Sequence, residues 1–205
     1  TGTNAGKWTE TVTCDWEGSK AITVRAIDKA GNEHTDTINV YIDTTAPNAE
    51  KITSDKGESI LVDGEADVSV TIYAADDENS TYNSGIATVK IIQIGNTKDL
   101  DVKATAKEID DPNDSSEEID DPNDARKKIT VYECSLPKGN LTDGKVVVEV
   151  TDKAKNVTKK DLFDISVDKS NPVVIIANPK DADTSSDGIQ VNGLIQLTGT
   201  ASDNK

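Results

Sequence analysis

Apolar and polar residues alternate with a period of two along most of the chain. In Lys20–Ile27, for example, Ile22, Val24 and Ala26 fall on one face. This period predicts half-buried β-strands. The same pattern predicts five further strands, at Asp67–Ala74, Gly85–Ile94, Lys128–Cys134, Gly144–Val150 and Asp161–Val167. No long window has a helical period, so we expect an all-β protein built as a sandwich or a barrel.

The chain also repeats itself. The stretch ITVRAIDKAGN at 22–32 matches VVVEVTDKAKN at 146–156, and INVYIDTTAP at 38–47 resembles FDISVDKSNP at 163–172. A third similarity links 68–76 with 195–203. The offset is 124 residues between Asp28 and Asp152 and 125 residues between Pro47 and Pro172. Such spacing predicts a tandem array of one structural unit.

These motifs resemble the bacterial immunoglobulin-like repeats of large surface and secreted proteins. The DKAGN turn at 28–32 and the DTTAP junction at 43–47 carry the resemblance. It implies tandem antiparallel immunoglobulin-like β-sandwiches with Greek-key connections. Residues 1–45 are then the C-terminal part of a first domain, 46–170 a complete domain with an acidic insertion at 107–126, and 171–205 the N-terminal part of a third. We therefore expect a segment of a longer protein.

Two departures from the family pattern suggest local differences. Lys155 replaces the turn glycine found at Gly31, so the second turn is expected to take another geometry. The second junction reads Lys169-Ser-Asn-Pro, which predicts a less rigid connection. At the first junction, Pro47 fixes its own φ and holds Ala46 extended, so a strand leaves one sandwich and enters the next with little slack.

Composition narrows the class of protein. The 205 residues carry 22 Lys and Arg against 38 Asp and Glu, a net charge of −16. This sign argues against nucleic acid and anionic membranes as partners, and no apolar run approaches the length of a bilayer span. Only 34% of residues are hydrophobic and 3% aromatic, so we expect thin cores of Val, Ile and Ala.

The two cysteines fall at similar places in different units, each after a Thr-Val run and before an Asp-Lys-Ala turn. We expect Cys14 and Cys134 to be unpaired, because they lie in different units and a disulfide needs Cα atoms within about 7 Å. We also expect both thiols to be mostly buried, since an unpaired cysteine behaves as a small hydrophobic residue. A disulfide or a thioester-like crosslink is the alternative. There is no C-x-x-C pair to suggest zinc or redox chemistry.

The resemblance implies that acidic residues gather where the chain enters each sandwich. The last strand of one domain would bring Asp43 to the loops that carry Asp76, Asp77 and Asp152 of the next. At the second junction, Asp168 would approach Asp203. These six are candidate calcium ligands, since calcium takes six to eight oxygen ligands and would stiffen the joints. The alternative is that they are solvated acids that form turns.

An acidic phrase, EIDDPND, occurs at 108–114 and again at 118–124. The first copy follows a strand expected around Leu100–Ala106, so the resemblance implies that the phrase lies in a loop at the pole where the chain enters the sandwich. It has no EF-hand pattern. Three interpretations stay open: a mobile loop expanded by duplication, an extra strand pair on the sandwich edge, or a cation site.

Few residues suggest other chemistry. Trp8 aligns with a family tryptophan and is expected in the core, whereas Trp16 is a weak candidate for binding a sugar or a protein partner. His34, the only histidine, lies among polar residues with no nucleophile motif nearby. We therefore expect no enzyme activity in this segment.

The leading hypothesis is a non-catalytic stalk or spacer at a bacterial cell surface or in the extracellular medium. It contacts neighbouring repeats and takes part in adhesion to a host or cell-surface protein or glycan. One alternative is an accessory module of an extracellular carbohydrate-active enzyme. Another is a module that itself binds a glycan or a protein.

Overall fold

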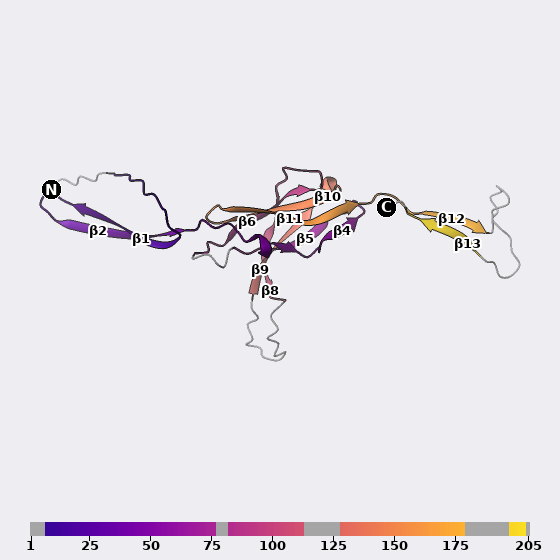
Figure 1. Cartoon of the computed structure of the whole chain (residues 1–205), viewed down its shortest axis with the longest axis horizontal. Coiled ribbons are helices and arrows are strands. Elements are labelled where there is room, and N and C mark those ends of the chain that lie inside the picture. Colours follow the sequence, from indigo (N-terminus) through magenta and orange to yellow (C-terminus); the bar gives the residue numbers. More distant parts are fainter. Residues whose placement is uncertain (1–6, 77–81, 113–127, 179–196, 204–205) are drawn as a thin grey trace, which may run out of the picture.

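The computed structural model describes residues 7–76, 82–112, 128–178 and 197–203. Within these ranges the protein is all-β, with several mostly antiparallel sheets and two short 3-10 turns, η1 (Ala49–Lys51) and η2 (Lys138–Asn140). A central body is flanked by one hairpin on each side along the long axis (Figure 1). The described residues contain no helix with the length and apolar character needed to cross a membrane.

The larger sheet of the central body has five strands. In spatial order they are β4 (Ser59–Val62), β11 (Val157–Val167), β10 (Gly144–Asp152), β6 (Ile86–Ile94) and β7 (Val102–Lys103). Neighbouring strands are antiparallel except for β4, which runs parallel to β11 and pairs Ser59 with Asp164 through to Val62 with Val167. The first and last strands of this sheet in the sequence are thus adjacent in space.

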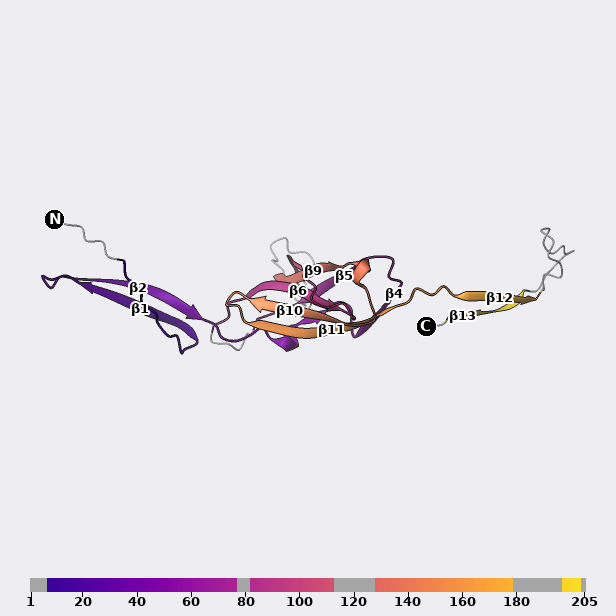
Figure 2. The same ribbon diagram turned by 90° about the horizontal axis from the view of Figure 1, so that it is seen from above.

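The second sheet has four strands. In spatial order they are β3 (Thr53–Ser54), β5 (Val68–Tyr73), β9 (Lys128–Leu136) and β8 (Thr105–Asp110). Side chains of the two sheets share one buried cluster, in which Val70 and Leu136 of this sheet pack with Ile91 and Val148 of the other. The two layers are visible in Figure 2. This arrangement is consistent with a β-sandwich.

The core is built mainly from β-branched residues, as the alternating pattern predicts. Four of these residues are 0% exposed: Ile72, Ile91, Val146 and Val148. Alanine, which we expected in the core, contributes only partly buried side chains such as Ala74 among the described residues. The larger Leu, Tyr and Phe side chains fill the remaining space, because a sandwich core needs volume that alanine does not supply.

The N-terminal hairpin repeats the register of the last hairpin of the body. Strands β1 (Gly18–Ile27) and β2 (Glu33–Ile42) pair Ile27 with Glu33, and the equivalent residues of β10 and β11, Thr151 and Val157, pair in the same way. The register of β10 and β11 then shifts between Val146 and Val147, leaving Leu162 as an extra residue in a β-bulge. This bulge accounts for the change of offset from 124 to 125 residues.

Trp8 is not in a core. Its side chain is 68% exposed, and Ile38 of the same hairpin region is 60% exposed. The expectation is wrong because no second sheet covers β1 and β2 among the described residues. A second hairpin, β12 (Val173–Asn178) with β13 (Thr198–Ser202), lies beyond the other end of the body.

The cysteines are free, as predicted. Cys134 is half-buried on β9, but Cys14 is exposed, so the expected burial is wrong for Cys14. Cys14 is exposed for the same reason as Trp8: it precedes strand β1, which no second sheet covers among the described residues.

The first copy of the acidic phrase begins inside a strand. Its residues Glu108–Asp110 belong to β8, where Ile109 pairs with Ile129 and Asp110 pairs with Lys128 of β9. The strands β8 and β9 project from the side of the body, not from the pole that β2 reaches (Figure 1). The expected position at that pole is therefore wrong, because the chain changes sheets at Ala104 and extends β8 outward. The second copy lies outside the described residues.

Candidate functional site

Three aspartates from three segments meet at the first junction. Asp43 directly follows β2, Asp76 follows β5 by three residues, and Asp152 ends β10. Each side chain offers a carboxylate oxygen, and these oxygens all lie within 4.8 Å of one another. All three residues are buried, with 8%, 5% and 0% of their surface exposed. The structure thus brings together three of the four acids predicted for this junction, and Asp77 lies outside the described residues.

Asp152 is held by the turn that follows it. The backbone amide of Asn156 donates to Asp152 Oδ1 at 2.8 Å, and the Asn156 side-chain amide donates to Oδ2 at 2.8 Å. Asp28 receives the equivalent bonds from Asn32, at 2.9 and 2.7 Å. These bonds keep the Asp152 carboxylate directed toward the junction.

The second turn keeps the geometry of the first despite its lysine. Lys155 has φ of 80°, and the equivalent Gly31 has φ of 86°. The expectation of another geometry is wrong. The same pair of bonds from asparagine to aspartate holds both turns, so Lys155 adopts a left-handed conformation that costs a non-glycine residue roughly 1–2 kcal/mol.

Backbone amides from two other segments fix the remaining acids. Asp43 accepts from the amide of Thr45 at 3.1 Å and from the amide of Ser84 at 2.9 Å. Asp76 accepts from the amide of Gly85 at 2.7 Å. Burial raises the pKa of Asp43, but hydrogen bonds from Ser84 and Thr45 outweigh this effect and hold the pKa below its ordinary value. The Asp43 carboxylate is therefore stabilised in its charged form.

Asn156 connects the two sides of the junction, and it was not among the predicted site residues. Its side-chain amide donates to Asp152 Oδ2 and also to the backbone carbonyls of Asp43, at 3.0 Å, and Thr45, at 3.2 Å. The signal that would have found it is the matching asparagine at the end of both DKA turns. One residue thus ties the last strand of the N-terminal hairpin to the central body.

Further bonds hold the DTTAP segment between its two neighbours. The hydroxyls of Thr44 and Thr45 both donate to the Glu17 carboxylate, at 2.8 and 3.0 Å. On the other side, the hydroxyl of Thr158 donates to the carbonyl of Pro47 at 2.6 Å. Tyr41 of β2 also stacks on Tyr82 of the body, with ring centroids 5.0 Å apart. The junction is therefore fixed by side chains from both sides.

The second junction differs from the first. Asp168 is half-buried and accepts from the amide of Ser170 at 2.8 Å, while Asp203 is exposed at the end of β13. Within the described ranges, the first junction holds the one group of three or more metal-ligating side chains. Asp168 and Asp203 do not form such a group there.

The remaining candidates lie on the N-terminal hairpin or just before it. Trp16 is half-buried. The Lys20 ammonium lies 4.5 Å from the centre of the Trp16 ring, so lysine already covers one face of the indole. His34 is exposed and pairs with Ala26 across the hairpin.

The three carboxylates repel one another, and a bound cation would reduce this repulsion. Neither Asp43 nor Asp152 forms an ion pair with a lysine or arginine among the described residues. At 4.8 Å, two carboxylate charges repel by about 3 kcal/mol in a medium of effective dielectric constant 20. Two oxygens on one calcium ion, each at 2.3–2.6 Å, lie at most about 5 Å apart, so the observed spacing suits calcium.

Comparison of the sequence with protein-family models and with curated proteins gives no match.

Proposed function

We propose that this chain is a non-catalytic spacer. It is a segment of tandem immunoglobulin-like β-sandwiches from a bacterial cell-surface or secreted protein, with a first joint that calcium stiffens. Asp43, Asp76 and Asp152 hold the ion. The observation that carries the proposal is that a carboxylate from the N-terminal hairpin meets two carboxylates from the central body in one buried group.

The repeated hairpin supports the tandem arrangement. The register of β1 with β2 matches that of β10 with β11 up to the bulge at Leu162, and the two DKA turns make the same bonds from asparagine to aspartate. Two stretches of one chain with the same register and the same turn chemistry are expected of two copies of one unit. The Asp43 junction then connects one unit to the next.

The layout of the elements supports a spacing role. The N-terminal hairpin, the central body and the β12–β13 hairpin follow one another along the long axis (Figures 1 and 2). A spacer needs joints that resist bending, and the DTTAP segment is bonded to Glu17 on one side and to Asn156 and Thr158 on the other. A cation bound by acids from both units adds a further link across the same joint.

A calcium titration of the purified chain tests the proposal, with melting temperature and small-angle X-ray scattering as readouts. An ion that binds the folded state stabilises it by about 2.7 kcal/mol at a hundred times its dissociation constant. We expect millimolar calcium to raise the melting temperature and to reduce the range of end-to-end distances. Asp76→Asn removes one ligand from the group and should abolish both responses.

The matched control is Asp36→Asn, which removes an exposed carboxylate of β2 outside the group. It should leave both calcium responses intact. If the unmodified chain responds in neither stability nor length, the calcium joint is wrong. If scattering shows a joint that bends freely with and without calcium, the spacer role is wrong as well.

A further inference from the structure

The N-terminal hairpin presents an apolar face that no second sheet covers among the described residues. At the repeat offset of 124 residues, three residues on this face of β1 correspond to three residues of β10 that are 0% exposed. The pairs are Ile22 with Val146, Val24 with Val148 and Ala26 with Val150. Val24, by contrast, is 36% exposed, and Ile38 of β2 is 60% exposed. A cavity of about 660 Å³ lies on the same face, bordered by Trp8 and Val12. The hairpin thus carries one half of a core without the other.

The C-terminal hairpin is the counterpart of early strands of the body. The third internal similarity of the sequence relates β13 to β5 at an offset of 127 residues, and the linker before β12 has an offset of 125 residues. In the body, the Asn48 amide bonds to the Ala75 carbonyl at 3.3 Å. The equivalent residues, Val173 and Ser202, pair in the hairpin. Because β5 shares one buried cluster with β10 and β11, the C-terminal hairpin carries the other half of such a core.

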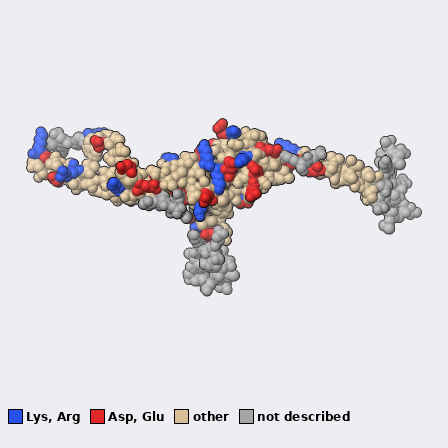
Figure 3. Space-filling model, in the orientation of Figure 1, with Lys and Arg blue, Asp and Glu red and all other residues tan. Residues whose placement is uncertain are grey.

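This second hairpin is apolar as well as exposed. Neither β12 nor β13 contains a charged residue, although 29% of the residues in the chain are charged. In Figure 3 this hairpin is tan, whereas red and blue side chains are frequent on the central body. Gly199 corresponds to the buried Ile72 of β5 and pairs with Ile176, so Ile176 lies on the side that faces the core in the body. Ile176 is 62% exposed, and Leu197 is 65% exposed.

The acids equivalent to the group at the first junction are divided between the two ends of the chain. The pairs of equivalents are Asp168 with Asp43, Asp203 with Asp76, and Asp28 with Asp152. The first two flank the C-terminal hairpin, and the third lies at the tip of the N-terminal hairpin. Asn32 already holds the Asp28 carboxylate, and its hydrogen bonds lower the pKa of Asp28. One end thus supplies two carboxylates of the group, and the other end supplies the third.

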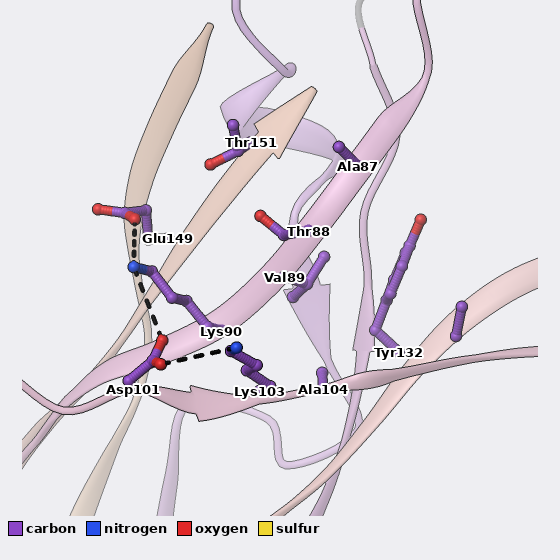
Figure 4. Close-up of a pocket in the computed structure, with 11 residues that line it drawn as sticks. Ala87, Thr88, Val89, Lys90, Asp101, Lys103, Ala104, Tyr132, Glu149 and Thr151 are labelled. Atoms are coloured by element: carbon purple, nitrogen blue, oxygen red, sulfur yellow. Dashed lines mark ion pairs between the residues drawn. The ribbon is translucent and has the colours of Figure 1, made fainter. Parts of the chain in front are cut away.

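The central body offers a surface of another kind. At the cleft on its edge, Lys90 lies 2.9 Å from Glu149 and 3.8 Å from Asp101 (Figure 4). Asp101 in turn lies 3.9 Å from Lys103. These charges are paired within one copy, so a partner would have to displace them. The two hairpins, in contrast, gain free energy by contact, because it removes their apolar side chains from water.

We propose that the C-terminal hairpin of one copy docks on the N-terminal hairpin of a second copy, so that the chain assembles head to tail. β12 and β13 of one copy cover β1 and β2 of the next, as β5 covers β10 and β11 in the body. Asp168 and Asp203 of one copy meet Asp28 of the next, and calcium binds between them. The inference rests on the tandem units of the proposed function. Because the two surfaces differ, the assembly does not close at a dimer but grows as a linear filament.

Sedimentation velocity of the full 205-residue chain tests the proposal, at tens to hundreds of micromolar and in millimolar calcium. Two hairpins form a small interface, and small interfaces associate weakly. We expect the mean sedimentation coefficient to rise steadily with concentration, without levelling off at a dimer. A chelator in place of calcium should weaken the association about tenfold, because the ion links acids of both copies.

Two variants, each blocked at one end, identify the surfaces. Val24→Asp puts a charge on the apolar face of the N-terminal hairpin, and Ile176→Asp puts one on that of the C-terminal hairpin. Each variant alone should stay monomeric. A mixture of the two should form a dimer and nothing larger, because each supplies the end that the other lacks. Ala21→Asp, on the opposite face of β1, is the matched control and should assemble like the unmodified chain.

A second pair of variants separates this proposal from the calcium joint within one copy. Asp203→Asn should remove the calcium dependence of the association but keep the rise in melting temperature that calcium causes in dilute solution. Asp76→Asn should keep the first response and remove the second. A failure of one proposal can therefore be told from a failure of the other.

Three outcomes would overturn the proposal. The first is a chain that stays monomeric at every concentration, which would mean that something other than a second copy covers the two hairpins. The second is association that persists in both Val24→Asp and Ile176→Asp, which would locate the contact elsewhere. The third is association that only one of these variants abolishes, which would mean that like hairpins pair with each other. Equal association in calcium and in chelator would refute the shared ion.

Discussion

Replacing Asn156 by alanine removes the side-chain amide that spans the first junction. This amide donates to the Asp152 carboxylate and to the backbone carbonyls of Asp43 and Thr45. All three acceptors are in buried or partly buried residues, so water does not replace the lost donor freely. The turn itself keeps its backbone bond from the amide of residue 156 to Asp152 Oδ1. The change therefore acts mainly on the link between the hairpin and the body.

The expected loss follows from the number of hydrogens. An amide group carries two, so we count two bonds for the three acceptors. One is to a carboxylate and contributes about 1.5–3 kcal/mol, and one is to a carbonyl and contributes about 0.5–1.5 kcal/mol. The sum is about 3 kcal/mol. With a urea dependence of about 2 kcal/mol per molar, the unfolding midpoint should fall by about 1.5 M.

Urea unfolding followed by far-ultraviolet circular dichroism measures this loss, in buffer with a calcium chelator. The chain contains its own control, because Asn32 ends the same kind of turn. Within the described part of the chain its side-chain amide donates only to Asp28, at 2.7 Å, on an exposed surface. Asn32→Ala should therefore lower the midpoint much less. Small-angle scattering should show a wider range of lengths for Asn156→Ala alone.

Equal losses in the two variants would refute this reasoning. They would mean that the asparagine stabilises only its own turn and that its bonds to the linker carbonyls contribute nothing. An unchanged midpoint in Asn156→Ala would lead to the same conclusion.

Three further predictions concern single residues. Folding lowers the pKa of Asp43, so the stability that this residue contributes is present above the ordinary aspartate pKa of about 4 and is lost as the pH falls through the lower pKa of the folded state. Calorimetry from pH 6 to pH 2 should show that the melting temperature of Asp43→Asn falls less steeply with acid than that of the unmodified chain. Identical pH profiles for the two proteins would contradict this. Lys155→Gly should raise the free energy of unfolding by about 1 kcal/mol, because glycine adopts positive φ without strain, and Gly31→Lys should lower it; no change in the urea midpoint of either variant would count against the strained turn. Burial raises the pKa of Cys134 to about 11, so a thiol reagent at pH 8 should modify Cys14 quickly and Cys134 much more slowly, and two equally fast thiols would disprove the burial argument.

The strands were predictable because one face of each is buried. Alternation places Val68, Val70 and Ile72 on one side of β5, and the structure buries Val70 and Ile72 completely while Val68 packs at the edge of the core. The meeting of Asp43 with Asp152 was also predictable, since it depends only on which strand ends share a pole. The strands follow from the period, which the sequence displays directly, whereas the meeting of the acids follows from the topology that the resemblance to immunoglobulin-like repeats implies.

Other features depend on contacts that no local pattern encodes. The role of Asn156 requires knowing which backbone carbonyls come within reach of its side-chain amide. The alignment of Trp8 with a family tryptophan predicts a core position, but burial also needs a second sheet. The bulge at Leu162 left a trace in the sequence, as a change of one residue in the repeat offset, but only the pairing of the strands identifies the residue responsible.

The parallel pairing of β4 with β11 has a mechanical consequence. The central body is joined to its C-terminal neighbour just after β11, whereas on the N-terminal side η1 and β3 come between the junction and β4 (Figure 1). The amides of Asp164 and Asp168 donate to the carbonyls of Glu58 and Val62, at 2.9 and 2.8 Å, so the bonds between these strands lie across the direction of a pull on the two ends. Such a pull slides the strands past each other and strains all these bonds at once, instead of breaking them one after another. Tension that passes η1 and the short strand β3 is therefore borne in shear by the β4–β11 pair.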